Sequence, residues 1–139
     1  MTRLESTSPE QTVEIGKRLG GALRAGAVVS LEGPLGAGKT TLVKGIAAAL
    51  GIEEPVTSPS FTLISSYHGS TDLHHVDLYR LEALAEIEDL GLEELMAGGG
   101  VTVIEWGEKA AALLPADAIR VRVEIDGGGR AVSIEGAAP

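Results

Sequence analysis

The sequence predicts an α/β fold, in which a central β-sheet, mostly parallel or mixed, is flanked by helices and carries β-hairpins. Three observations predict this fold. The apolar run 27–32 leads into a glycine-rich loop and then into a helical pattern that ends at Gly51. The apolar run 101–106 is rich in β-branched residues and predicts a second buried strand. Alternating segments on either side of 69–71 and of 126–129 predict two hairpins.

The size and composition of the chain limit its domain count and its ligands. With 139 residues we expect a single domain over 1–139, large enough for one substantial core. The formal net charge is -9, with 20 acidic residues against 11 basic ones, and no cluster of Lys or Arg occurs. Because tight binding to nucleic acid needs a basic surface, this composition argues against direct binding of RNA or DNA.

Two absences in the sequence exclude further classes. The chain has no cysteine, so disulfides, zinc–thiolate sites and cysteine nucleophiles are excluded. Neither a signal-like segment nor an apolar run of about 18 residues is present, so we expect a cytoplasmic protein without a membrane segment.

The first expected element is a helix near the amino terminus. Ser8 has the position of an N-cap, Pro9 lies in the first turn, and Gln11 follows three residues after the cap. The apolar spacing that follows predicts a helix to about Arg24, ended by Gly26.

The glycine-rich loop and the residue after it, 33–41, read GPLGAGKTT and match the pattern G-x-x-x-x-G-K-[ST] at every fixed position. Such a loop turns backbone N–H groups toward a polyphosphate, which requires glycines with positive φ and little side-chain bulk. Lys39 would reach the β- and γ-phosphates, and the hydroxyl of Thr40 is a candidate Mg²⁺ ligand. A glycine-rich connection without a ligand is the alternative, but a strand before the loop and a helix after it favour phosphate binding. The candidate nucleotide-binding residues here are Gly33, Gly36, Ala37, Gly38, Lys39, Thr40 and Thr41.

The segment 57–63 is rich in hydroxyl groups around Pro59. It is either a plain connection or a loop that responds to the γ-phosphate and to magnesium, as loops at this place in nucleotide-binding proteins commonly do. We favour the second interpretation, which makes Ser58 and Thr62 candidate nucleotide-binding residues.

The second strand of the first hairpin ends in a polar motif. Period-two alternation places His75, Asp77 and Tyr79 on one face and the apolar residues between them on the other. Asp77 at a strand end near the loop could act on water or on the metal's ligand shell. In the alternative, Asp77 caps the following helix and Arg80 pairs with a nearby acid. His74 and His75 are not expected to be metal ligands, because no further His or Cys completes a transition-metal site.

An acidic helical segment and a buried apolar strand follow. Residues 81–89 and 92–96 form a broken helical pattern around Gly91, and their acidic side chains predict a solvated face that a basic partner would fit. The buried strand 101–106 brings Glu105 to its end, as a strand does that carries a carboxylate to the Mg²⁺ beside a phosphate loop. Trp106 is expected either to pack under the site or to face a partner.

A short helix and a β-hairpin are expected in the remainder of the chain. The segment 107–114 predicts a short helix that Pro115 stops, and 119–125 and 130–134 alternate as the strands of the last hairpin.

Four motifs taken together resemble the TsaE (YjeE) family. They are 33–41 (GPLGAGKTT), 58–63 (SPSFTL), 75–80 (HVDLYR) and 104–106 (IEW), and their order and spacing match the family over nearly the whole chain. Many nucleotide-binding proteins share the first motif alone, so the combination carries the resemblance. Pro34 departs from the family's commoner Asp and is not expected to disturb phosphate binding.

The resemblance implies a small bacterial P-loop ATPase with the cofactors ATP and Mg²⁺. In the family, the protein acts with TsaD and TsaB in the threonylcarbamoyl modification of adenosine 37 in tRNAs, next to the anticodon. A separate enzyme makes the threonylcarbamoyl-adenylate, and the ATPase is weak without its partners. This chain would therefore reach tRNA only indirectly, through homologues of TsaD and TsaB.

The resemblance also implies a role for each matching residue. Lys39 and Thr40 would bind phosphate and magnesium, Glu105 would be the second metal ligand, and Asp77 the catalytic acid, with Lys39 also assigned to catalysis. The family further implies adenine contacts from the start of the first helix and from the last hairpin, near Thr12 and 129–130.

Two other classes of function stay open from the sequence. A P-loop small-molecule kinase would share the loop but needs an acceptor pocket and arginines that cover the transferred phosphate. A nucleotide-gated binding module would bind ATP without meaningful catalysis. We therefore expect Asp77→Ala to separate this last class from an ATPase, because only an ATPase would lose turnover.

Overall fold

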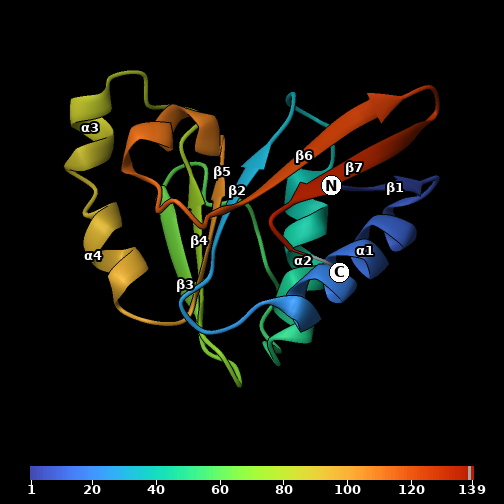
Figure 1. Cartoon of the computed structure of the whole chain (residues 1–139), viewed down its shortest axis with the longest axis horizontal. Helices are drawn as coiled ribbons and strands as arrows, with labels where there is room; N and C mark the ends of the chain where they lie inside the picture. Colours follow the sequence, from blue (N-terminus) through green and yellow to red (C-terminus); the bar gives the residue numbers. More distant parts are fainter. Residues whose placement is uncertain (138) are drawn as a thin grey trace.

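The computed structural model describes residues 1–137 and 139, and these form a single α/β architecture (Figure 1). Its elements in chain order are β1 (Thr2–Ser6), α1 (Pro9–Ala22), β2 (Val28–Glu32), α2 (Lys39–Ala49), β3 (Ile64–Tyr67), β4 (Leu73–Asp77), α3 (Leu84–Glu88), α4 (Leu92–Ala97), β5 (Val101–Glu105), the 3₁₀ helix η1 (Gly107–Leu113), β6 (Ile119–Asp126) and β7 (Gly129–Glu135).

The strands of the described residues form one sheet in the order β1-β7-β6-β2-β5-β4-β3. The central strands β6, β2, β5 and β4 are parallel neighbours. The hairpins β3–β4 and β6–β7 are antiparallel, and so is the pairing of β1 with β7. This confirms the predicted mixed sheet and both predicted hairpins.

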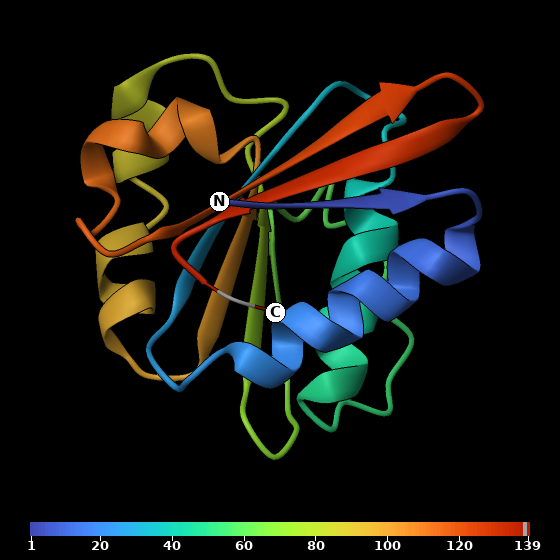
Figure 2. The same cartoon turned by 45° about the vertical axis from the view of Figure 1, so that its right-hand side comes forward.

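Helices cover both faces of the sheet, as Figures 1 and 2 show. α1 and α2 lie together on one face, and their apolar residues join the larger core with those of the central strands. α3, α4 and η1 cover the other face over a smaller core. Val76 and Leu78 belong to this smaller core, whereas His75 and Asp77 point the other way, so the predicted alternation is confirmed.

The contact between α1 and α2 depends on two glycines. A Cβ atom at Gly16 would collide with the carbonyl oxygen of Leu42, and one at Gly45 with that of Val13. The two helices therefore approach each other more closely than larger residues would allow, which brings the start of α1 beside the start of α2.

Several expected boundaries differ from the structure. α1 ends at Ala22 rather than near Arg24, and the helix expected over 81–89 is only Leu84–Glu88. The first strand of the hairpin around 69–71 begins only at Ile64, because a turn that takes Leu63 to a φ of 68° precedes it. The short helix expected over 107–114 is confirmed as η1, which has 3₁₀ geometry.

The strand β1 was not expected, because its sequence TRLES has little apolar alternation. Its pairing with β7 places it at one edge of the sheet, where solvent-facing polar residues are tolerated.

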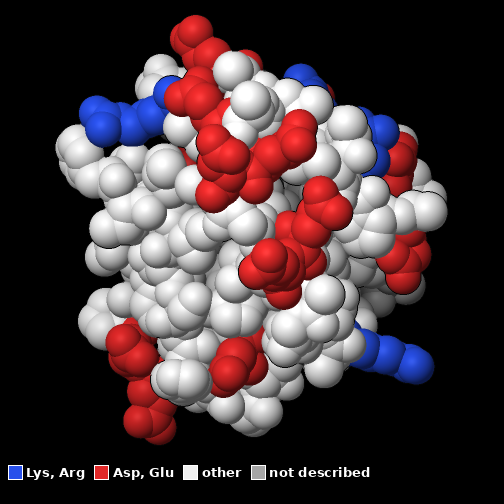
Figure 3. Space-filling model, turned by 90° about the vertical axis from the view of Figure 1, so that its left-hand side faces the viewer, with Lys and Arg blue, Asp and Glu red and all other residues white. Residues whose placement is uncertain are grey.

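The solvent-exposed surface of α3 and α4 is acidic, as expected. Acidic side chains predominate on it in Figure 3. The acidic residues of this segment are all exposed: Glu82, Glu86, Glu88, Asp89, Glu93 and Glu94. Within residues 1–137 and 139, each helix is too short or too polar to span a bilayer.

Candidate nucleotide-binding site

The carboxyl ends of three parallel strands meet at one edge of the sheet. β2 runs into the loop 33–38, and the loop leads to α2. In the strand register, Glu105 at the end of β5 lies opposite Leu31 of β2 and opposite Asp77 of β4. Ligands of open α/β sheets bind in the crevice outside this edge. The motifs of the loop, of β4 and of β5 therefore come together at one place.

The backbone of the loop has the conformation that its glycines were expected to provide. Gly33, Gly36 and Gly38 have φ values of 139°, 78° and 102°, which favour glycine over residues with a side chain. Gly38 caps α2 and has no side chain that could accept the N–H groups of the first turn of that helix. Because the N–H groups of a first turn have no acceptor within the helix, they can bind an anion.

Lys39 lies buried beneath the loop. Its Nζ donates hydrogen bonds to the carbonyl oxygens of Gly33 and Pro34, and it lies 3.9 Å from the centroid of the Trp106 ring. Burial lowers the pKa of Lys39, and the nearby carboxylates, Glu105 first among them, oppose this shift. The ammonium group is thus held at the loop by contacts that phosphate oxygens could replace.

Thr40 and Glu105 form an oxygen pair that fits magnesium. The hydroxyl Oγ1 of Thr40 donates to Oε2 of Glu105 at 2.9 Å, and a hydroxyl that donates one hydrogen bond keeps lone pairs for a cation. Among residues 1–137 and 139, no three His, Asp or Glu side chains cluster as ligands of a metal ion. A site with few protein oxygens suits Mg²⁺, which usually keeps waters and substrate phosphates as its other ligands.

A hollow of about 350 Å³ lies in front of these groups. We call it the phosphate hollow. Its lining residues are Leu35, Gly36, Gly38, Lys39, Thr40, Thr41, Ser58, Ser60, Asp77, Tyr79, Glu105 and Trp106.

Asp77 is buried and its two oxygens have different partners. Oδ1 accepts the backbone N–H of Tyr79 at 2.9 Å, and Oδ2 lies 3.4 Å from the hydroxyl of Ser58. Asp77 thus stabilises a turn rather than capping a helix, since α3 begins only at Leu84. Arg80 does not pair with an acid among the described residues; its guanidinium lies 4.4 Å from the centroid of the Phe61 ring.

The hydroxyl-rich segment reaches the site in part. Ser58 and Ser60 line the phosphate hollow and share a hydrogen bond of 2.8 Å between their hydroxyl oxygens. Thr62 is exposed and is not among the residues that line either hollow at the loop. The structure therefore brings Ser58 to the site and leaves Thr62 outside it.

One wall of the phosphate hollow is aromatic. Trp106, with a φ of 60°, packs its ring 5.1 Å from that of Tyr79, measured between centroids. Lys109 donates to the carbonyl oxygens of Tyr79 and Leu81 and so ties the turn after β4 to η1. Of the two alternatives expected for Trp106, its position agrees with packing at the site, and a partner contact stays a prediction.

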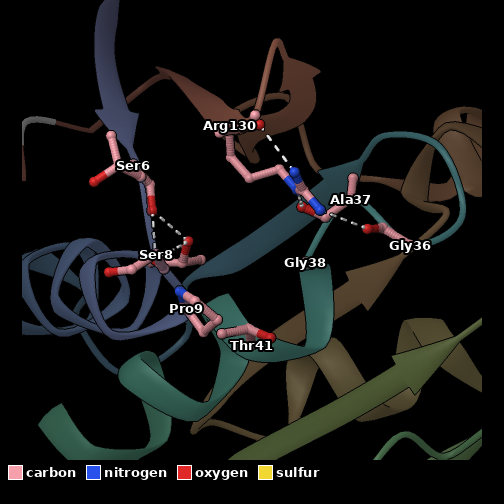
Figure 4. A pocket seen from close by; sticks show the side chains of 12 residues that line it. Ser6, Ser8, Pro9, Gly36, Ala37, Gly38, Thr41 and Arg130 are labelled. Atoms are coloured by element: carbon pink, nitrogen blue, oxygen red, sulfur yellow. Dashed lines mark hydrogen bonds between the residues drawn. The ribbon is translucent and has the colours of Figure 1, made fainter.

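A second hollow of about 260 Å³ opens on the other side of the loop (Figure 4). We call it the nucleoside hollow. Besides Gly36, Gly38 and Thr41, which both hollows share, its lining residues are Ser6, Thr7, Ser8, Pro9, Thr12, Ala37, Gly128, Gly129 and Arg130. Arg130 closes it against the loop, because its Nε donates to the carbonyl oxygen of Ala37 at 2.8 Å and its Nη2 to that of Gly36 at 3.3 Å.

The nucleoside hollow contains the positions that the family resemblance implied for adenine, Thr12 and 129–130, but also residues that sequence reasoning missed. Ser6 at the end of β1 is buried and shares a hydrogen bond of 2.7 Å with the hydroxyl of Thr12. Ser8 was expected only as a helix cap, and its hydroxyl does accept the N–H of Gln11. No sequence signal marks Ser6, because the strand that carries it was not predicted.

The fold and the loop define an α/β protein that carries the P-loop sequence pattern between a buried parallel strand and a helix. The sequence model of one family, described as threonylcarbamoyl adenosine biosynthesis protein TsaE, matches residues 6–132. The chain belongs to this TsaE family, whose place is in tRNA threonylcarbamoyladenosine biosynthesis.

Individual relatives agree with this assignment. The tRNA threonylcarbamoyladenosine biosynthesis protein TsaE of Treponema pallidum is 46% identical over 123 residues, which are 88% of this chain and 91% of that protein. The TsaE of Bacillus subtilis is 42% identical over 120 residues, or 86% of this chain and 75% of that protein. A crystal structure of Bacillus subtilis YdiB superposes with a TM-score of 0.79 at 32% identity, covering 96% of this chain and 83% of that one.

Proposed function

We propose that this chain is the Mg·ATP-binding ATPase subunit of a complex that attaches the threonylcarbamoyl group to adenosine 37 of tRNAs. Its partners are homologues of TsaD and TsaB, and it reaches tRNA only through them. The observation that carries the proposal is the meeting of two hollows at one glycine loop, with Lys39, Thr40, Glu105 and Asp77 gathered in one of them. This layout suits a nucleoside on one side and a polyphosphate on the other.

The residues of the phosphate hollow divide the binding work. The amides of the loop and of the first turn of α2 bind the phosphate oxygens, and Lys39 turns from the carbonyls of Gly33 and Pro34 toward the outer phosphates. Thr40 and Glu105 hold Mg²⁺, which when bound neutralises negative charge on the phosphate oxygens.

Asp77 is the proposed catalytic carboxylate. Its Oδ1 accepts the backbone N–H of Tyr79, whereas its Oδ2 accepts from the hydroxyl of Ser58, which also lines the phosphate hollow. A carboxylate oxygen fixed in this way can accept a hydrogen bond from the attacking water and orient it. Ser58 and Ser60, within the segment 57–63, contact the outer phosphate. The conformation of this segment therefore depends on the bound nucleotide, and partners bind to it.

The charge of the chain supports an indirect route to tRNA. The net charge of -9 repels a polyanion, and the exposed face over α3 and α4 is acidic (Figure 3). A basic surface for tRNA must therefore come from a partner.

The test measures binding and turnover together. We expect calorimetry to detect Mg·ATP binding to the purified chain, and homologues of TsaD and TsaB to raise ATP hydrolysis and to associate with it in an ATP-dependent way. Lys39→Ala should abolish turnover, whereas the control Lys44→Ala, on the exposed side of the same helix, should not. Absence of heat with Mg·ATP, or indifference to both partners, contradicts the proposal.

The alternative of a small-molecule kinase finds less support. Of the arginines in the described residues, Arg130 lines a hollow at the loop, and its guanidinium is bonded to loop carbonyls. Phosphate transfer to a metabolite rather than to water would favour a kinase.

A further inference from the structure

His75 is a buried polar residue to which the proposed function assigns no part. It lies on β4, its side chain is 0% exposed, and its Nε2 is 2.6 Å from Oε2 of Glu105. It does not line either hollow at the loop, so a ligand there would not touch it. Its contact with the site therefore runs through Glu105.

The surroundings of the imidazole indicate which nitrogen carries the proton. Nδ1 is buried and has no hydrogen-bond partner among the described residues. A proton on Nδ1 would leave a buried donor unsatisfied, which is costly, whereas a proton on Nε2 is donated to the carboxylate. The tautomer with its proton on Nε2 is thus the one that fits, and His75 donates to Glu105.

Two donors then converge on the same oxygen of Glu105. Oε2 accepts from Nε2 of His75 at 2.6 Å and from Oγ1 of Thr40 at 2.9 Å. These bonds come from different elements, β4 and α2, so together they hold Oε2 in place from two sides. The other oxygen, Oε1, has no hydrogen-bond partner in the described part of the chain.

We propose that His75 is a positioning residue that holds the carboxylate of Glu105 in the orientation in which it binds the divalent cation of a bound nucleotide. The proposal rests on the proposed function. Carboxylates that bind a metal are commonly oriented by such hydrogen bonds, and loss of the orienting group typically lowers metal affinity about 10- to 100-fold.

A role in packing alone explains His75 less well. The unpartnered Nδ1 is a cost to stability that an apolar side chain of similar size would not carry. A buried imidazole at this position is therefore expected to contribute something other than stability.

The test compares ATP binding with Mg²⁺ and with EDTA by calorimetry. We expect His75→Leu to bind ATP in EDTA as the wild type does. The factor by which Mg²⁺ increases ATP affinity should be about tenfold smaller in this variant than in the wild type. His75→Gln, whose side-chain amide places an N–H near the position of Nε2, should restore most of that gain. The matched control is His74→Leu, because His74 bonds to Ser66 and not to the site.

A double-mutant cycle with Glu105→Gln asks whether His75 acts through Glu105. If it does, the loss of Mg²⁺-dependent affinity in the double variant equals that of Glu105→Gln alone. Additive losses, an unchanged Mg²⁺ gain in folded His75→Leu, or an equal loss in EDTA overturns the proposal. If thermal melting shows that His75→Leu is unfolded, the comparison of His75→Gln with the shorter His75→Asn replaces it. An equal increase in ATP affinity on addition of Mg²⁺ in these two variants overturns the proposal.

The wild-type titrations separate this proposal from the one it rests on. A wild-type chain that does not bind Mg·ATP overturns both proposals. A wild-type chain that binds Mg·ATP, together with variants at His75 that bind it equally well, overturns only the role of His75.

Discussion

The two hollows beside the phosphate loop are built in different ways. The phosphate hollow takes its charged residues from the ends of adjacent parallel strands and from the start of α2, and each lies in a recognisable motif. The nucleoside hollow joins the first turn of α1 and the end of β1 to the tip of the last hairpin, from opposite ends of the chain. The comparison shows that site residues within short motifs can be predicted from the sequence. Residues of a hollow that is built from distant, weakly patterned segments cannot, because their meeting depends on how the strands pair.

The largest expected effect is in the phosphate hollow. Asp77→Ala should lower the turnover of ATP by about 10²- to 10⁴-fold, the usual contribution of acid–base catalysis, with little change in ATP affinity. Partner-stimulated hydrolysis and calorimetry measure the two quantities. The control is Asp72→Ala, because Asp72 pairs with exposed His68. Unchanged turnover would remove Asp77 from its proposed role.

The second largest effect is expected for Glu105, which also lines the phosphate hollow. Glu105→Gln removes the negative charge opposite Thr40 and should reduce the Mg²⁺-dependent part of ATP affinity about tenfold, leaving binding in EDTA unchanged. Exposed Glu108, nearby in η1, provides the control variant Glu108→Gln. Equal losses with and without Mg²⁺ would contradict a metal-binding role.

Arg130 tests the nucleoside hollow. Arg130→Met removes the bonds that join β7 to the loop carbonyls of Ala37 and Gly36, and hydrogen bonds of a charged group contribute about 1.5 kcal/mol or more. We expect roughly tenfold weaker ATP binding, equal with Mg²⁺ and with EDTA. Arg122→Met, on the exposed face of the same hairpin, should bind normally. A loss of ATP affinity that occurs only with Mg²⁺ would contradict the assignment of metal binding to the phosphate hollow alone.

Ser6 tests whether β1 supports the nucleoside hollow. Ser6→Ala breaks the buried hydrogen bond to Thr12 and should lower the free energy of unfolding by about 1 kcal/mol. Urea unfolding measures the change, and Ser66→Ala on the exposed hairpin is the control. Identical unfolding midpoints for Ser6→Ala and the wild type would show that this bond does not stabilise the fold.

The smallest effect concerns the buried cation of the phosphate hollow. Because burial lowers the pKa of Lys39 in the folded chain, the unfolded chain binds more protons between that lowered pKa and the ordinary value of 10.5. Stability therefore rises with pH in this interval. Compared with Lys39→Met, the wild type should become relatively more stable as pH increases there. Urea unfolding of both proteins across the interval gives the difference, and a slope of opposite sign would contradict the burial argument.

Sequence reasoning succeeded where local constraints are strong. The loop glycines, the helix after them and the carboxylate at the end of β5 follow from patterns a few residues long, and the structure has them at those positions. It failed where the neighbours are distant. β1 carries almost no alternation and is a strand because it pairs with β7.

His75 shows the same limit within a motif. Its sequence neighbours marked it as one of a polar set on a strand face, but the pattern did not indicate that its ring nitrogen meets Glu105, which follows 30 residues later. That contact arises because β4 and β5 pair in parallel with Asp77 opposite Glu105.

The sequence by itself determined the class of fold, the phosphate loop and the family, since short-range patterns of glycine, charge and apolar spacing encode them. The tertiary structure alone decided that Ser6 and Arg130 line the same hollow, that Thr62 lines neither hollow at the loop, and that Nε2 of His75 contacts Glu105. These outcomes depend on the register and order of strands, which bring together residues that no local pattern connects.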